Sequence, residues 1–158
     1  MRDLKRSQFD IVLAFLVTGT VVFLDQLTKS LFSKILILGE SLPVIQNIFH
    51  VTLVHNTGIA FGFLKEQGSV FIVIPAIAII LLVFNIFYYK QNDEALSRPY
   101  IIGFSLILGG AIGNLIDRIS VGYVIDFIDF RFWPVFNVAD SAITIGAVLI
   151  AVKCFKTK

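Results

Sequence analysis

The sequence predicts an all-α membrane protein of four transmembrane helices, with a small extracytoplasmic β-strand cradle. Hydrophobic residues make up 57% of the 158-residue chain, and the mean hydropathy is +0.89. Charged residues make up 15% of the chain, whereas a soluble domain carries about 25%. Long uncharged segments also alternate with shorter polar ones. Together these observations indicate a single integral membrane domain over residues 1–158.

Four segments are apolar enough to cross a bilayer, which requires about 20 residues each. They lie at about residues 9–31, 69–89, 99–116 and 135–152. The second contains no charged residue, and the fourth contains one, Asp140. The third is rich in glycine, and the four-residue spacing of Gly109 and Gly113 lets a neighbouring helix approach closely.

The basic residues predict the orientation of the chain, because lysine and arginine are enriched in cytoplasmic segments. Eight of the thirteen basic residues flank the predicted spans on one side: Arg2, Lys5, Arg6, Lys90, Arg98, Lys153, Lys156 and Lys158. We therefore expect both termini in the cytoplasm, and the segments 32–68 and 117–134 outside it. The formal net charge of +2 is too small to indicate a nucleic-acid partner.

The two outer segments contain stretches typical of β-strands. Residues 49–53 alternate between apolar and polar side chains, which is the period of a half-buried strand. Residues 123–130 are rich in β-branched and aromatic side chains. A small sheet on the outer membrane surface would satisfy the backbone hydrogen bonds of both stretches.

Polar residues from three predicted helices fall at one depth. At about 1.5 Å per residue, Asp25, Asn114 and Asp140 each lie roughly 20–24 Å from the cytoplasmic end of their helix. Ionisable groups at membrane depth cost at least about 2.5 kcal/mol each, so they are rare and usually functional. We expect these residues to form one site near the outer leaflet.

Several carboxylates are candidates for a catalytic pair at this site. Asp140 is the strongest, because apolar helix flanks it and no basic residue lies within a turn. Asp117 could serve as its partner, or it could hold a helix end. Asp126 and Asp129 are three residues apart, so in a strand they point to opposite faces, and only one can reach the site. The spacing alone leaves the choice among these partners open.

Other polar residues favour different roles. Asp25 and Lys29 are spaced i and i+4 with the acid first, which is the favourable order for a helical ion pair. His50 and His55 lie in the strand-like segment, where we expect no serine or cysteine placed for activation. A Ser/His hydrolase is therefore poorly supported.

Five motifs occur in order along the chain: Asp25-Gln-Leu-Thr-Lys29, Asn56-Thr-Gly-Ile-Ala-Phe61, Gly109-Gly-Ala-Ile-Gly-Asn114-Leu-Ile-Asp-Arg118, Val124-Ile-Asp126-Phe127 and Phe136-Asn137-Val-Ala-Asp140-Ser141. Together they resemble the lipoprotein signal peptidases (signal peptidase II), over essentially the whole chain. The resemblance implies an aspartic endopeptidase that removes signal peptides from diacylglyceryl-modified prolipoproteins. It would cleave on the N-terminal side of the lipidated cysteine.

The resemblance also implies which residues act. The family's catalytic pair corresponds to Asp126 and Asp140, not to Asp117. Family positions that line the site are Asp25, Lys29, Asn56, Gly110, Asn114, Arg118, Asn137 and Ala139. The resemblance implies no metal or cofactor. The expected setting is a monomer in the bacterial cytoplasmic membrane, in contact with membrane lipid, with its active site near the outer leaflet.

Two other functions are compatible with buried polar residues in a membrane. Intramembrane carboxylates also mark the pathway of small proton- or ion-coupled transporters. Such transporters usually contain paired, interrupted hydrophobic segments in two halves of the chain, and this sequence has none. The third possibility is a membrane chaperone or assembly factor whose acids hydrogen-bond the helices together.

Overall fold

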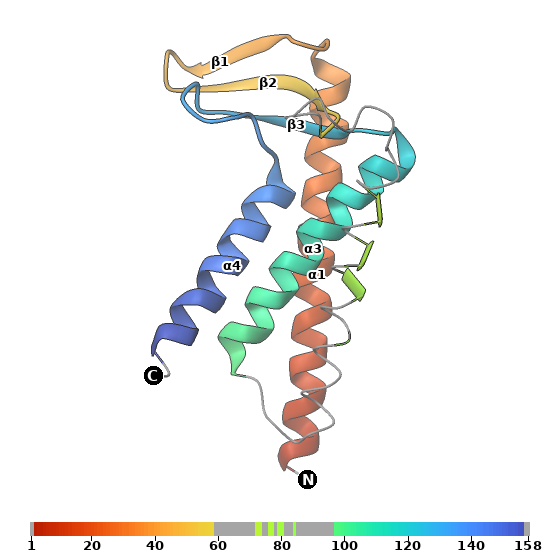
Figure 1. The fold of residues 1–158 in the computed structure, drawn as a ribbon, viewed down its shortest axis with the longest axis vertical. Coiled ribbons are helices and arrows are strands. Elements are labelled where there is room, and N and C mark those ends of the chain that lie inside the picture. The colour runs from red at the N-terminus through yellow and green to blue at the C-terminus, as the bar shows by residue number, and fades with distance from the viewer. Residues whose placement is uncertain are drawn as a thin grey trace.

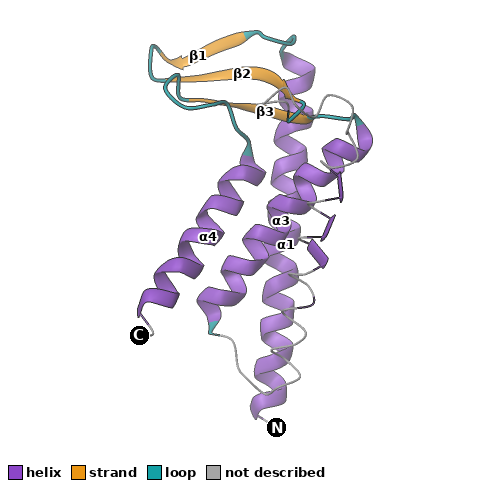
Figure 2. Cartoon of the chain, in the orientation of Figure 1, coloured by secondary structure: helices purple, strands orange, loops and turns teal. Residues whose placement is uncertain are grey.

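Three long helices lie beneath a small sheet in the computed structural model, which describes residues 2–58, 72–73, 76–77, 79–80, 84 and 97–156. The helices are α1 (Arg2–Ile35), α3 (Arg98–Ser120) and α4 (Val138–Lys156). The strands are β1 (Ser41–Ile45), β2 (Phe49–Asn56) and β3 (Val124–Asp129). The start of α1 and the end of α4 both lie at the end of the molecule opposite the sheet (Figure 1). Figure 2 shows the same division into a helical and a strand region.

Three helices in the described residues are long and apolar enough to cross a membrane: Gln8–Ile35, Arg98–Ser120 and Val138–Phe155. They cover the predicted spans 9–31 and 99–116 and most of 135–152. The predicted span 69–89 lies largely outside the described residues. The predicted count of four helices is therefore not confirmed, since the described part of the chain contains three.

The start of the last helix differs from the prediction. Helix α4 begins at Val138, three residues after the predicted start at 135. Phe136 instead pairs with Ile128 of β3 through backbone hydrogen bonds of 2.8 and 3.1 Å. Hydropathy alone could not detect this extension of the sheet, because the residues just before Val138 are as apolar as those of a membrane-spanning helix. Asp140 consequently lies in the first turn of α4.

Helix α3 packs between α1 and α4, and its glycines make this possible. A Cβ atom on Gly109 would lie 2.8 Å from the Cβ of Val21 on α1. A Cβ atom on Gly110 would collide with the backbone carbonyl of Ala139 on α4. The missing side chains therefore let the backbone of α3 approach both neighbours closely, which brings the start of α4 against the middle of α3.

The three strands form an antiparallel sheet in the order β1-β2-β3. Strands β2 and β3 confirm the extended stretches predicted at 49–53 and 123–130. Strand β1 was not predicted, because Pro43 and its short, non-alternating sequence give little strand signal. Phe127 of β3 packs against Phe32 near the end of α1, with tilted rings whose centroids are 4.7 Å apart. This contact holds the sheet against the end of α1.

Candidate active site

Buried polar side chains gather where α1, α3, β3 and α4 meet. Asp25 and Lys29 come from α1, and Asn114 and Asp117 from α3. Strand β3 contributes Asp126, and the residue that precedes α4 is Asn137. These six side chains form one hydrogen-bonded network: Asp25, Lys29, Asn114, Asp117, Asp126 and Asn137. The structure thus confirms that the polar residues of separate helices lie at one level.

The ammonium group of Lys29 is the centre of this network. Lys29 is 1% exposed and forms ion pairs of 2.8 Å with both Asp25 and Asp117. Its third contact is a hydrogen bond of 3.0 Å to Oδ1 of Asn114. A lysine ammonium has three donors, so all three have an acceptor. The predicted ion pair between Asp25 and Lys29 is confirmed.

The contact with Lys29 fixes the orientation of the Asn114 amide. An ammonium can only donate hydrogen bonds, so it must face the carbonyl oxygen of that amide. Nδ2 of Asn114 consequently points the other way and donates to Oδ1 of Asp140 at 2.8 Å. The side chain of Asp140, half-buried at the start of α4, is thus held by helix α3.

Asn137 and Asp140 together form a reciprocal cap at the start of α4. The backbone N–H of Asp140 donates to Oδ1 of Asn137 at 2.9 Å, and the backbone N–H of Asn137 donates to Oδ2 of Asp140 at 3.3 Å. This is the geometry of a capping box. Because a backbone N–H fixes the Asn137 oxygen, Nδ2 of Asn137 faces Asp126 and donates to its Oδ1 at 2.7 Å. Asn137 therefore links the two aspartates.

The carboxyl group of Asp126 is held on both sides by amides. Besides Asn137, Nδ2 of Asn56 at the end of β2 donates to Oδ2 of Asp126 at 2.9 Å. Asp126 is 1% exposed. Burial, together with the nearby charge of Asp140, raises the pKa of Asp126 to about 6, although the two amides and Lys29 oppose the shift. A carboxyl group with this pKa can hold or release a proton near neutral pH.

Asp117 and Asp129, the two other candidates for the partner of Asp140, bind different residues. Asp117 accepts hydrogen bonds from Gln26 at 2.9 Å and from the backbone N–H of Ile125 at 3.1 Å, in addition to its ion pair. Asp129 accepts from Thr52 at 2.6 Å and pairs with Arg131 at 2.9 Å. Asp126 and Asp129 lie on opposite faces of β3, as expected. The structure therefore brings Asp126, not Asp117 or Asp129, together with Asp140.

The remaining residues implied by the resemblance lie around this network. Ala139 is fully buried, and its backbone N–H donates to Oδ1 of Asp25 at 2.9 Å. Gly110 packs against the carbonyl of Ala139. The guanidinium of Arg118 is close enough to interact electrostatically with Asp140, Asp117 and Asp126. Within the described part of the chain it forms no ion pair with any of them.

Two features were missed from the sequence. Gln26 joins α1 to α3 through Asp117 and the carbonyl oxygen of Gly113, and only its position beside Asp25 could have suggested this. We expected no serine placed for activation by either histidine, yet Oγ of Ser41 lies 3.0 Å from Nδ1 of His50 at an exposed position. Ser41 belongs to the unpredicted strand β1, which explains why this contact was not expected.

Comparisons with known proteins agree with this arrangement. The model of the signal peptidase (SPase) II family matches residues 17–156. The lipoprotein signal peptidase of Halothermothrix orenii is 45% identical, over 87% of this chain and 92% of the relative. That of Caldanaerobacter subterraneus is 48% identical, over 87% of this chain and 92% of the relative. A solved bacterial membrane enzyme at 35% identity covers 94% of this chain and 96% of its own, with a TM-score of 0.84. With the motifs, the helical packing and these likenesses in accord, the chain belongs to the signal peptidase II family.

Proposed function

We propose that this protein removes the signal peptide from bacterial prolipoproteins and that Asp126 and Asp140 are its catalytic pair. The protein is an aspartyl protease of a bacterial membrane, as its family membership and its three apolar helices indicate. The observation that carries the residue assignment is the bridge through Asn137. One side chain and its own backbone N–H contact both carboxyl groups, at 2.7 and 3.3 Å. Asn137 thus connects the two carboxyl groups, and neighbouring carboxyl groups can share one proton between them.

The surroundings of the two carboxyl groups suggest how the proton is shared. Asp140 lies in the first turn of α4, where the helix dipole favours negative charge. It also accepts hydrogen bonds from the Asn114 amide and from a backbone N–H. Asp126 is more deeply buried, and its raised pKa favours the protonated form. Asp140 is therefore the base in this proposal, and Asp126 is the acid.

The reaction follows from these roles. Asp140 takes a proton from a water molecule as the water oxygen bonds to the scissile carbonyl carbon. Asp126 donates a hydrogen bond and then its proton to the oxygen that becomes negatively charged. When the C–N bond breaks, Asp140 gives its proton to the leaving nitrogen, and Asp126 takes back a proton from a hydroxyl group of the diol intermediate. The products are a signal peptide that ends in a carboxylic acid and a lipoprotein with a free amine, and both carboxyl groups return to their starting states.

Arg118 is suited to bind the substrate in this scheme. Its guanidinium lies in the field of three aspartates without an ion pair to any of them in the described residues. It therefore retains donors for a peptide carbonyl group near the pair. We expect Arg118 to orient the substrate backbone, because guanidinium groups offer several donors in a fixed geometry.

The position of the site suits a lipid-modified substrate. The network lies at the sheet end of the helices, whereas the basic N- and C-terminal segments lie at the other end (Figure 1). By the positive-inside rule the termini face the cytoplasm, and the site lies near the outer leaflet. The diacylglyceryl chains would remain in the bilayer, in contact with exposed apolar side chains of the helices. Cleavage just before the lipidated cysteine would then need only the peptide to reach the carboxyl groups. A single chain contains every residue of this scheme, so we propose a monomer.

The transporter alternative has no support from the comparisons, since every relative named above is a lipoprotein signal peptidase. The chaperone alternative has no support from the comparisons either, since the relatives are named as peptidases. Both would leave prolipoprotein uncut.

The experiment mixes the purified protein in lipid with a diacylglyceryl-modified prolipoprotein. We expect cleavage by the unmodified enzyme, and a loss of at least about 10³-fold in kcat for Asp126→Asn and for Asp140→Asn. Asp129→Asn is the matched control, because it changes a buried aspartate on the same strand and should cut within about threefold of the original rate. Undiminished cleavage by either of the first two variants would sink the assignment. Equal cleavage of the unlipidated precursor would show that lipid is not recognised.

A further inference from the structure

Lys29 takes no part in the chemistry proposed above, yet it is among the most buried side chains of the molecule. It is 1% exposed, and all three of its donors have acceptors. Burying a lysine is costly unless it is paired, and here two carboxylates surround a single ammonium. The role of Lys29 can therefore be sought in the residues that its three partners contact.

The first path from Lys29 leads to Asp140. The ammonium donates to Oδ1 of Asn114 at 3.0 Å, and Nδ2 of Asn114 donates to Asp140 at 2.8 Å. Oδ1 of Asn114 also accepts a hydrogen bond from Nδ2 of Asn137 at 3.0 Å. If the Asn114 amide rotated by 180°, its oxygen would face the carboxylate of Asp140, and the carboxyl group would move. Lys29 and Asn137 together oppose this rotation, and removing Lys29 weakens that restraint.

The second path leads to Asp126. The ammonium pairs with Oδ2 of Asp117 at 2.8 Å, and the same oxygen accepts the backbone N–H of Ile125 at 3.1 Å. Ile125 immediately precedes Asp126 in β3. Lys29 therefore holds the backbone of this strand beside the end of α3, one residue from the second carboxyl group.

A third contact holds the start of α4. Asp25, the other ion-pair partner of Lys29, accepts the backbone N–H of Ala139 at 2.9 Å. Ala139 precedes Asp140 in the first helical turn. One ammonium thus joins three elements, α3, β3 and α4, at the residues next to both carboxyl groups.

We propose that Lys29 is a positioning residue that sets the relative placement of Asp126 and Asp140, through Asn114 on one side and through Asp117 and Asp25 on the other. The inference rests on the proposed catalytic role of the two aspartates. It differs from a purely structural role, in which the ammonium would only stabilise the packing of α1 against α3.

The test replaces the ammonium by an apolar side chain of similar length, in Lys29→Met. We expect kcat on lipidated prolipoprotein to fall about 100-fold, because a displacement of about 1 Å at a reacting group has this effect. KM should change by less than about threefold, since Lys29 does not touch the substrate. Lys34→Met is the matched control, because Lys34 is an exposed lysine in the last turn of the same helix, and its kcat should be unchanged.

The pH profile gives a second readout, which tests whether the charge of Lys29 acts on Asp126. The charged groups around Asp126 are Lys29 on α1, Asp117 and Arg118 on α3, and Asp140 on α4. Lys29 lowers the pKa of Asp126, so its removal should shift the alkaline limb of kcat/KM to higher pH. Lys34→Met should leave this limb in place.

Lys29→Met leaves two buried carboxylates with no cation, so it could also unfold. Lys29→Met/Asp25→Asn removes one of these charges, and its thermal unfolding temperature in detergent should return toward that of the original protein. We expect kcat of this double variant to stay at least about 30-fold low, because Asn114 keeps the hydrogen bond from Asn137 but still lacks the one from the Lys29 ammonium. Recovery of kcat together with the fold would overturn the inference, as would full activity of Lys29→Met. If the unmodified enzyme cut no prolipoprotein, the proposed function itself would fail, which is a separate outcome.

Discussion

The two faces of strand β3 carry buried aspartates that differ sharply in chemistry. Asp126 is 1% exposed and Asp129 is 4% exposed. Asp126 faces two amides and a second carboxyl group, and its pKa rises to about 6. Asp129 is also penalised by burial, yet hydrogen bonds from Thr52 and Arg131 outweigh that effect and lower its pKa. The partners of a carboxyl group, more than its burial, thus decide whether it can exchange a proton near neutral pH.

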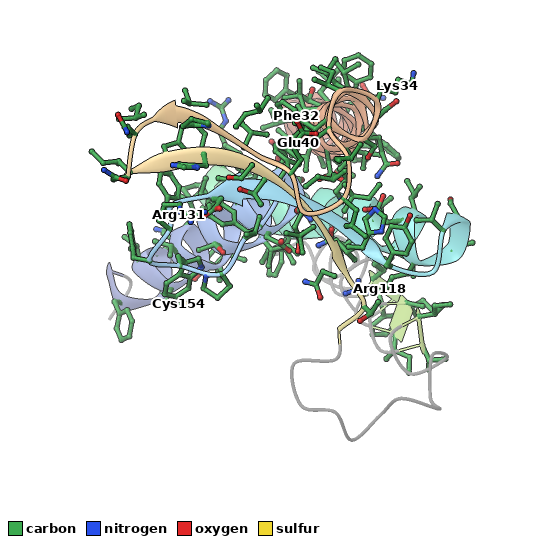
Figure 3. The ribbon with its side chains drawn as sticks, turned by 90° about the horizontal axis from the view of Figure 1, so that it is seen from above. Phe32, Lys34, Glu40, Arg118, Arg131 and Cys154 are labelled. Carbon is green, nitrogen blue, oxygen red and sulfur yellow. The ribbon has the colours of Figure 1, made fainter. Side chains whose placement is uncertain are left out.

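The location of the two residues matches this difference. In Figure 3, which views the sheet from above, Arg118 and Arg131 lie well apart. Arg118 and Lys29 both interact electrostatically with Asp126, and Arg131 is paired with Asp129. Arg131 is half-exposed and compensates its aspartate directly. Asp126 lacks such an ion pair in the described residues, so its charge can respond to a substrate.

Among the residues that hold the aspartates of β3, the largest expected effect comes from removing Asn137, which links the two carboxyl groups. Asn137→Leu deletes the donor to Asp126 and the N-terminal cap of α4. We expect kcat to fall by about 10²–10³-fold. Thr52→Val, which deletes the donor to Asp129 on the other face, should change kcat by less than about threefold. Equal losses in both variants would remove the distinction between the faces.

The alkaline limb of the pH dependence should respond to the surroundings of Asp126 and not to those of Asp129. If Asp126 acts in its protonated form, kcat/KM should decrease as the pH rises through about 6. Asn56→Ala removes a donor that lowers the pKa of Asp126, so the limb should move to higher pH. Asp129→Asn serves as the control, and a shift of the limb in that variant would contradict the account. The measurement is kcat/KM against pH for the three enzymes.

The smallest expected effect is on stability, and it should have opposite signs at the two positions. Asp129 has a lowered pKa, so it stabilises the fold above its ordinary value of 3.8, and this contribution is lost as the pH falls through the lowered value. Asp129→Asn should therefore reduce the free energy of unfolding at pH 7 by about 1–2 kcal/mol.

Asp126 has a raised pKa, so its ionised form destabilises the fold above pH of about 6. Asp126→Asn should leave the free energy of unfolding unchanged or higher at pH 7, with any gain disappearing below the ordinary pKa of 3.8. Thermal unfolding in detergent at several pH values checks both signs. A large loss of stability in Asp126→Asn would indicate that this residue serves the fold.

Much of the fold and part of the site could be predicted from the sequence, because hydropathy and residue spacing are local signals. Hydropathy located the helices α1, α3 and α4, alternation located β2, and β-branched and aromatic content located β3. Depth counting brought Asp25, Asn114 and Asp140 to one level, and the contacts confirm it.

What could not be predicted depends on tertiary contacts. The start of α4 at Val138 follows from a backbone bridge between Phe136 and Ile128, which leaves no mark in hydropathy. The choice of Asp126 over Asp117 depends on which carboxyl group the Lys29 ammonium reaches. Spacing along one chain does not contain that information, and only the family resemblance had favoured Asp126.

The most direct test of the central claim is a double-mutant cycle on kcat, with lipidated prolipoprotein as substrate. The variants are Asp126→Asn, Asp140→Asn and the two together. If the carboxyl groups act as one unit, the double variant should be about as slow as either single variant, because removing one member already disables the pair. Losses that multiply in the double variant would mean that the two aspartates act independently, and the account of a proton-sharing pair would then be wrong.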